Sequence, residues 1–380
     1  MTRSHHARAR GGFALPAAIF SLVLLSALVA GALFVSTEEL RSGRGDGADQ
    51  RALAAAEWAL DRAILAWDPQ RNITQPIGRT DTLMAIAGAP NDAVVVTATR
   101  VQRAAVWLTA TATRGGDGRG IPARHTVGAS LRLVAAGDLA RAALTTPGPV
   151  LVDGGIIDGR DVTPVGYSAA MCAETDSVAG IAVPDASRVT CATCATSANS
   201  GVFGTPPIDS SGFVDPAFSV LVAETIAALV RRSQIDLPGG TLIPRPAAVN
   251  AVCDVADPLN WGDPRASSAC ANWFPVIHVR GSVVLAAGAV GQGILVADGS
   301  VRLEGTARFV GVVIAGADIT VTGPGAEIAG AAVAGATNSA ALSTVTGGGA
   351  IRFGGCAVQR ASMTAARLVR TPSRWWIELR

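Results

Sequence analysis

The feature that most constrains this chain is a long uncharged run near its N-terminus, Phe13–Val35. At 1.5 Å per residue, a helix of this length spans about 34 Å, enough to cross a hydrocarbon core of about 30 Å. Three arginines precede the run, and Glu38 and Glu39 follow it. Because positive flanks stay on the cytoplasmic side, we expect a single-pass inner-membrane anchor with a cytoplasmic N-terminus and a periplasmic body.

A cleaved secretory signal is the alternative interpretation of this run. Its apolar core would be shorter, about 7–15 residues, and would end in a small-x-small cleavage site. The C-terminal end of the run and the residues after it, Phe34–Glu38, match such a cleavage site poorly. The anchor is therefore the preferred interpretation.

The run is preceded by the basic, glycine-ended segment Arg10–Gly12 and begins with Phe13–Pro16. This arrangement resembles the class III leader of type IV pilins. The resemblance implies that a prepilin peptidase cuts between Gly12 and Phe13, that Phe13 is then N-methylated, and that the apolar run becomes the first half of a long helix. Ala17 departs from the major-pilin pattern, which has Glu at this fifth mature position. The departure favours a minor or tip-located subunit.

Three glycines within Ser42–Gly47 predict a flexible break after the apolar run, because each disfavours a helix by about 1 kcal/mol relative to alanine. The Arg-Gly-Asp triplet inside this segment is interpreted as part of a loop rather than as an adhesion motif. The helix is expected to resume at Ala48 and to end at Asp68-Pro69. Its apolar residues recur at spacings of three, four and seven, which places them on one face. They are Leu53, Ala56, Leu60, Ala63, Ile64 and Trp67.

The stretch Asp49–Leu60 carries an Ala-Ala-Ala-Glu core and resembles the N-terminal domain of PilX-type minor pilins. With the apolar run, the resemblance covers residues 13–67. It implies a minor pilin or pseudopilin of a type IV pilus or related secretion assembly. Its partners would be other pilin subunits, met through the helix, together with the prepilin peptidase and the inner membrane. Its final location would be the pilus or cell surface, and no cofactor is implied.

Three runs rich in valine and threonine predict strands after the helix. They are Ala93–Thr99, Ala104–Thr113 and Thr126–Val134. The glycine-rich segment 115–120 is expected to be the hairpin loop between the second and third runs. A long helix followed by an antiparallel meander agrees with the pilin resemblance.

Residues 141–280 are rich in Pro, Gly, Ser and Asp and are expected to be irregular, with one helix from Asp215 to Arg232. In an exported chain, disulfides are the preferred use of the cysteines, because no second Cys-x-x-Cys or histidine pair completes a zinc site with Cys191. Cys253 with Cys270 is the favoured pair, closing a loop of about 17 residues worth about 3 kcal/mol. All the disulfide candidates are Cys172, Cys191, Cys194, Cys253, Cys270 and Cys356.

The C-terminal third contains an internal repeat. Residues 293–305 align with residues 311–323, and a weaker copy begins at Gly330. Short Val/Ile strands that end at glycine or aspartate turns and recur at this period predict a parallel β-solenoid of about three or four coils. Similar repeats occur in the C-terminal parts of PilX-like proteins. The end, Trp375–Leu379, is expected to be a closing strand or an exposed aromatic contact.

The sequence offers little catalytic chemistry. It contains no lysine, which excludes a Walker A loop and a Schiff-base enzyme. A net charge of +2 without a basic stripe gives no indication of nucleic-acid binding. His125 and His278 fall in strand-like runs, where a structural role is expected. We predict no catalytic residues, no metal and no enzymatic activity.

Two other functions remain open. One is a membrane-anchored envelope or surface β-solenoid outside any pilus system. The other is a carbohydrate-active solenoid enzyme, which needs clustered carboxylates. The coils offer only scattered acids for that role, namely Asp298, Glu304, Asp318 and Glu327.

The predicted fold class is α+β, with a long N-terminal pilin-like helix whose first half spans the membrane, an antiparallel β meander and C-terminal β-solenoid-like repeats. The predicted divisions are a leader at 1–12, the helix at 13–67, a β domain at 68–140, the irregular cysteine-containing region at 141–280, the solenoid repeats at 281–356 and a C-terminal strand or tail at 357–380.

Overall fold

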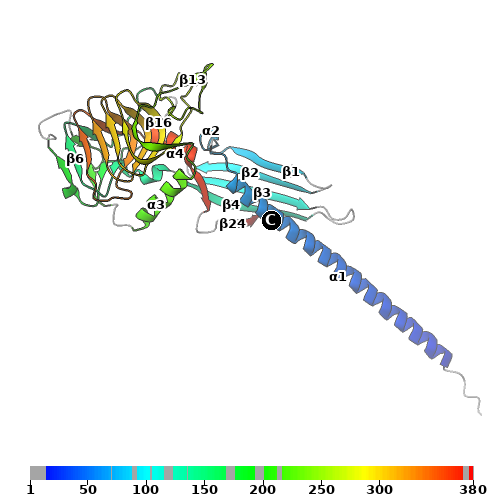
Figure 1. Cartoon of the computed structure of the whole chain (residues 1–380). Coiled ribbons are helices and arrows are strands. Elements are labelled where there is room, and N and C mark those ends of the chain that lie inside the picture. Colours follow the sequence, from blue (N-terminus) through cyan, green and yellow to red (C-terminus); the bar gives the residue numbers. More distant parts are fainter. Residues whose placement is uncertain are drawn as a thin grey trace, which may run out of the picture.

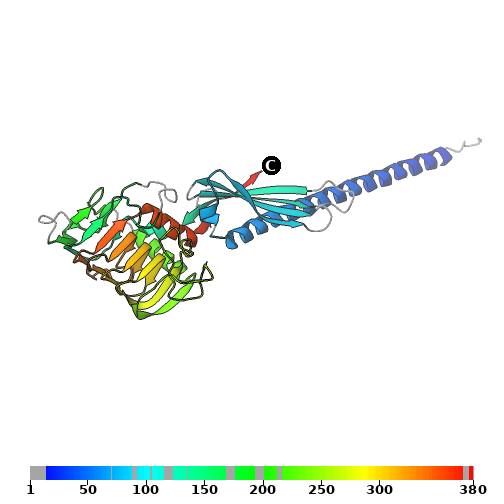
Figure 2. The same ribbon diagram turned by 90° about the horizontal axis from the view of Figure 1, so that it is seen from above.

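The computed structural model describes residues 14–69, 71–87, 92–102, 105–114, 123–134, 136–167, 176–192, 201–211, 216–370 and 376–379. They form a long N-terminal helix, an antiparallel sheet and a large parallel β-solenoid. Figures 1 and 2 show the first half of the helix extending away from the sheet, with the solenoid at the opposite end of the molecule.

Helix α1 (Ala14–Leu65) is one continuous element of 52 residues. The predicted break at Ser42–Gly47 is wrong, because the helix continues through all three glycines. Extending an existing helix adds a hydrogen bond per residue without a new nucleus, and this offsets the glycine penalty. Ala48 and Ala52 also pack on Ala123 of the sheet and hold the next turns in place. The Arg-Gly-Asp triplet therefore lies in a helix and not in a loop.

The second half of α1 packs along the antiparallel sheet. Its predicted apolar face is confirmed, since Ala56, Leu60 and Ala63 are buried in the core that the helix shares with the sheet. Leu53, Ile64 and Trp67 pack against the same core. A short helix, α2 (Arg71–Thr74), follows.

The antiparallel sheet has six strands. They are β1 (Thr80–Ala87), β2 (Ala93–Gln102), β3 (Ala105–Arg114), β4 (Ala123–Val134), β23 (Arg367–Arg370) and β24 (Trp376–Leu379). β2, β3 and β4 cover the three predicted strands, whereas β1 was not predicted. β23 and β24 both pair with β4. Of the two interpretations of the C-terminal end, the closing strand is confirmed.

The solenoid is an insertion into this sheet. Val134, at the end of β4, and Arg367, at the start of β23, are register partners in one antiparallel pair. Between them the chain leaves through the 3-10 helix η1 (Ala136–Leu139), builds the solenoid and returns through α4 (Gly355–Ala365). Within the predicted tail at 357–380, β23 and β24 therefore belong to the N-terminal sheet, and most of α4 precedes them.

A polar cluster ties α4 to the base of the sheet. Asn72 donates from Nδ2 to the carbonyl oxygen of Met363, at 2.8 Å, and accepts from Nε1 of Trp67, at 2.9 Å. Arg100 donates to the carbonyl oxygen of Asn72. These bonds fix the point at which the inserted solenoid meets the helix and sheet.

The predicted repeat is confirmed as parallel coils. The strands of this part are β15 (Val276–Leu285), β16 (Val290–Ala297), β17 (Val301–Glu304), β18 (Arg308–Ala315), β19 (Ile319–Thr322), β20 (Glu327–Val333), β21 (Ser343–Thr346) and β22 (Ala350–Phe353). Gly293 pairs with Gly311, and Gly311 pairs with Gly330, so each copy of the sequence repeat is stacked on the next. One coil is β16 followed by β17, and the next is β18 followed by β19.

The strands that the structure describes between residues 142 and 209, a region predicted to be irregular, belong to the same solenoid. They are β5 (Ala142–Thr145), β6 (Val150–Asp153), β7 (Ile156–Asp158), β8 (Ala179–Ala182), β9 (Val189–Cys191), β10 (Gly201–Phe203) and β11 (Ile208–Asp209). β5, β6 and β7 pair in parallel with β20, β21 and β22. The two chain segments thus stack in one column. β12 (Ile235–Leu242) pairs with β15 at the other end of the column.

Helices cover parts of the solenoid. The predicted helix near 215–232 is confirmed as α3 (Pro216–Val230), which joins the solenoid core through Val222 and Leu229. α4 packs through Ala357 on Val310 and Ala329. The core itself consists of the inward-facing branched residues of successive coils.

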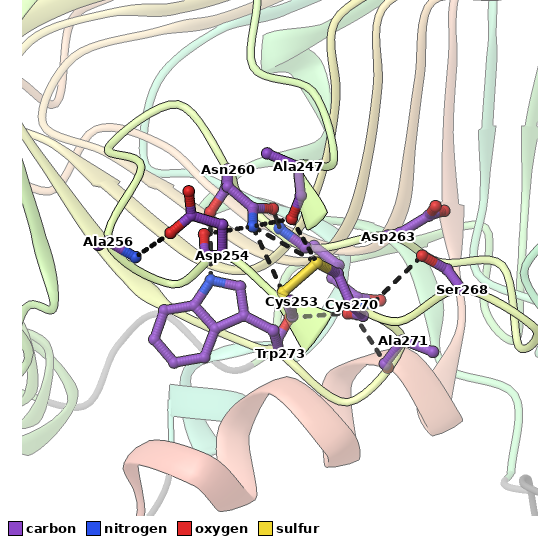
Figure 3. The surroundings of a disulfide bond; sticks show 12 residues. Ala247, Cys253, Asp254, Ala256, Asn260, Asp263, Ser268, Cys270, Ala271 and Trp273 are labelled. Atoms are coloured by element: carbon purple, nitrogen blue, oxygen red, sulfur yellow. Dashed lines mark hydrogen bonds between the residues drawn. A yellow bond between two sulfur atoms is a disulfide. The ribbon is translucent and has the colours of Figure 1, made fainter. Parts of the chain in front are cut away.

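The predicted disulfide between Cys253 and Cys270 is confirmed (Figure 3). It pins a loop that carries the small antiparallel pair β13 (Ala248–Val249) and β14 (Val252–Cys253). Nδ2 of Asn260 donates to the carbonyl oxygens of Ala247 and Asp254, at 3.0 and 2.6 Å. Cys191 and Cys356 are also disulfide-bonded. Cys172 and Cys194 lie outside the described residues.

The disulfide loop covers one side of the solenoid. Trp261 is fully buried and meets Phe309 edge to face, with 6.4 Å between the ring centroids. Nε2 of the buried Gln292 donates to three carbonyl oxygens of the loop, including that of Trp273 at 3.0 Å. The loop is therefore a fixed cover of the coils.

Candidate functional site

The most distinctive functional element is the first half of α1. Leu15–Leu40 is long and apolar enough to cross a membrane, and none of it is buried against the rest of the chain. Burying a Leu, Phe or Val side chain is worth about 1.5–3 kcal/mol. A surface made of many such side chains needs lipid or other apolar helices around it. Within the described part of the chain, this is the one helix with these properties.

The leader residues predicted from the sequence are not placed by the structure. Gly12 and Phe13 lie outside the described residues, so cleavage and N-methylation there stay predictions. Ala17 lies on the exposed first turns of α1, and the first turn contains no acidic residue.

A groove of about 650 Å³ lies beside the second half of α1, where the helix meets the sheet. We call it the helix groove and define it by Arg51, Ala54 and Trp58 of α1 with Ile86, Asp92 and Arg114 of the sheet side. Trp58 is 52% exposed and Ile86 42% exposed. The lining of the groove combines apolar and charged side chains.

Two arginines give the helix groove its charge. Arg114 forms an ion pair with Asp92, with 2.6 Å between Nη1 and Oδ2. Nε of Arg114 is buried and has no hydrogen-bond acceptor among the described residues. Arg51 donates from Nε to the carbonyl oxygen of Gly47, at 2.9 Å, so its guanidinium folds back toward the N-terminal end of α1.

The carboxylates proposed for a carbohydrate-active site have structural partners. Asp298 lies 3.0 Å from Nε2 of His278, whose Nδ1 is 3.3 Å from Asp236. Asp318 accepts a hydrogen bond from Oγ of Ser300 at 2.5 Å. Glu304 and Glu327 form ion pairs with arginines of the coils. The bonds of Asp318 and Glu327 link neighbouring coils, whereas Glu304 pairs with Arg302 of its own strand.

The two histidines that were predicted to lie in strands do so. His278 is in β15, as described above, and His125 is in β4, 3.5 Å from Asp49 of α1. Among the residues that the structure describes, no group of three His, Cys, Asp or Glu side chains is placed to hold a metal ion. The absence of a metal centre stays a prediction for the whole chain.

Two buried aspartates of the solenoid region, Asp158 and Asp263, form ion pairs with nearby arginines. Asp263 accepts from Nε and Nη2 of Arg265, at 3.0 and 2.7 Å, and Asp158 is bound in the same way by Arg160. Burial raises the pKa of each carboxyl, but the hydrogen bonds and charge of the arginine outweigh it. The net result is a lowered pKa for both aspartates, which keeps them ionised partners of their arginines.

Comparisons with known proteins give limited further information. No protein-family model and no curated protein matches the chain. Among solved structures, it is similar to a competence-associated pilin, ComZ from Thermus thermophilus, at 12% sequence identity and a TM-score of 0.24. The match covers 89% of this chain and 97% of that chain. A likeness at this level carries no argument about function, and it gives no specific support to the PilX-type resemblance.

Proposed function

We propose that this chain is a minor pilin or pseudopilin of the PilX type, a structural subunit of a type IV pilus or related secretion assembly. The observation that carries the proposal is the division of α1. Its first half is apolar and fully exposed, while its second half is fixed to a folded domain. A helix of this kind is stable in lipid and equally stable in a bundle of similar helices, so it suits a subunit that moves from membrane to filament.

The proposed sequence of events begins in the inner membrane, where Leu15–Leu40 anchors the chain with its body in the periplasm. A prepilin peptidase removes the leader after Gly12, and Phe13 becomes the N-methylated first residue. Other pilin subunits then contact α1 and carry the chain to the pilus or cell surface. Apolar burial holds the first half of α1 first in lipid and then in the helix bundle, and the proposal needs no cofactor, no metal and no catalytic residue and involves no nucleic acid.

The peptidase dependence of surface location tests this proposal. The chain is followed in surface material sheared from the native host, with and without its prepilin peptidase. We expect the chain in the sheared fraction only when the peptidase is present. Equal amounts in both strains would overturn the pilus role.

That contrary outcome would favour the second candidate, an anchored envelope solenoid. The observation behind it is that the solenoid has its own core, apart from the core shared by α1 and the sheet. Such a module needs only an anchor to be displayed, with no assembly machinery.

A further inference from the structure

Two glycines in α1, Gly31 and Gly43, have no explanation in the packing of the chain, and Gly43 is the one outside the membrane-spanning segment. Gly43 lies in the middle of the helix, where glycine is less favourable than alanine. A Cβ at this position would meet no atom within 4 Å, so the packing of this chain does not require glycine there. Glu39 and Gly47 lie four residues to either side and share its side of the helix. We call Glu39, Gly43 and Gly47 the glycine face.

The helix groove has the complementary properties. Its lining contains small side chains such as Ala54, against which another helix can approach closely. Trp58 and Ile86 offer exposed apolar surface beside it. Arg51 stands at its rim with a positive charge, and the acidic residue of the glycine face carries the opposite charge. Shape and charge therefore match between two surfaces that belong to the same chain.

We infer that the helix groove of one subunit receives the glycine face of α1 from a second copy of this chain. Glu39 of the second copy pairs with Arg51, and Gly43 of the second copy lies over Ala54. This inference rests on the proposed function, because an assembly of subunits is what brings α1 of one copy beside the sheet of another. It gives that assembly a specific contact outside the membrane-spanning segment.

The contact sets the relative position of the two copies. Residues 39 and 51 are twelve positions apart, which is about 18 Å along a helix. When two copies are anchored side by side at the same depth in a bilayer, Glu39 of one copy and Arg51 of the other lie at different heights above the membrane. The two copies then do not dock. Docking requires one copy to be displaced by this same distance along the helix axis, as happens when a subunit is drawn out of the membrane.

Disulfide cross-linking between full-length copies tests the inference. One copy carries Gly43→Cys and the other carries Ala54→Cys, and the mixture is oxidised either in detergent micelles or in phosphatidylethanolamine–phosphatidylglycerol vesicles. We expect the mixed dimer in micelles and at least about tenfold less in vesicles, because displacing an anchored copy exposes apolar side chains to water. The matched control replaces Ala54→Cys by Asp49→Cys, an exposed position five residues earlier on another side of α1, and should give no mixed dimer.

A charge exchange tests the pairing itself. Glu39→Arg in the copy that carries Gly43→Cys, or Arg51→Glu in the copy that carries Ala54→Cys, should each lower the cross-linking yield roughly threefold, as loss of an exposed ion pair does. Combining both changes should restore the yield. Circular dichroism of each variant verifies that the fold is retained.

Three outcomes would overturn the inference. They are equal yields in micelles and vesicles, equal yields with the Asp49→Cys control, and a combined exchange that fails to restore cross-linking. The failure of the proposed function is separate, since it concerns leader processing and surface location in the host. A chain that cross-links as expected but keeps its leader would contradict the pilus role and leave the contact standing.

Discussion

At the scale of single residues, stacked glycines determine the shape of the coils. Gly293, Gly311 and Gly330 pair with one another across successive coils, and all three have positive φ angles. A Cβ at Gly311 would collide with the carbonyl oxygen of Gly293, and one at Gly330 with that of Gly311. The stacked strands β16, β18 and β20 therefore leave no room for a side chain at this position.

Gly311→Val should lower the free energy of unfolding by about 3 kcal/mol or more, through steric overlap and backbone strain. Gly43→Ala is the matched control, because α1 has open space there. It should leave stability unchanged or raise it by up to about 1 kcal/mol. Urea unfolding of both variants provides the measurement, and equal effects would contradict the role of the stacked glycines.

The buried aspartates predict a dependence of stability on pH. Because the pKa of Asp263 and Asp158 is lower in the folded chain than in the unfolded chain, about 3.9, the unfolded state binds more protons as pH falls. The stability that these carboxylates supply is present above about pH 4 and is lost as pH falls through their folded values. Asp263→Asn should lower the unfolding free energy at pH 7 by about 1–3 kcal/mol.

The same variant should also show a smaller loss of stability between pH 7 and pH 3 than the unaltered chain. Urea titrations at several pH values measure this difference. Parallel losses in the two proteins would show that the Asp263–Arg265 pair does not contribute to acid sensitivity.

At the scale of elements, the Cys253–Cys270 disulfide holds the loop that covers the coils around Trp261. Replacing both cysteines by serine should cost about 3 kcal/mol, as expected for a closed loop of this length. The loss should appear in the thermal unfolding of the solenoid, and α1 with its sheet should keep their stability. Unchanged unfolding of the solenoid would contradict the role given to this loop.

The success of sequence-based prediction differs between elements for physical reasons. The repeat that begins at Gly293, the strands at 93–134 and the helix near 216–230 carry strong local patterns, and all three were found. β1 and the strands β5–β11 are short or weakly alternating, and nothing local shows that β5 pairs with β20, which lies far along the chain. The break at Ser42–Gly47 was predicted from propensity alone, which a long packed helix overrides.

Only the part of the candidate site that has a strong local pattern could be predicted from the sequence. The apolar run of α1 is visible in the sequence because its composition alone defines it. The helix groove is not, because it joins Arg51 and Trp58 of α1 to Ile86 and Arg114 of different strands. The sequence does show glycines after the apolar run. They point to a helix contact only once the structure shows that α1 continues through them and that alanine would also fit at Gly43.

At the scale of the whole molecule, the solenoid is a module inserted between two adjacent strands. Because Val134 and Arg367 are register partners, a tight turn can join them. Replacing residues 135–366 by an Asn-Gly turn should therefore leave α1 and the antiparallel sheet folded, with loss of the contacts between α4 and Asn72. Near-UV circular dichroism and cooperative urea unfolding of this short chain are the measurements. A chain without cooperative unfolding would show that the sheet depends on the inserted solenoid.

The central claim is that α1 stays attached as the assembly helix after a short leader is removed. The most direct test is the intact mass and N-terminal sequence of the mature chain from its native host. The account predicts a chain that begins at N-methylated Phe13, and a Gly12 variant that remains uncleaved. A mature chain that begins at Met1, or one cut after the apolar run so that Leu15–Val35 is lost, would contradict it.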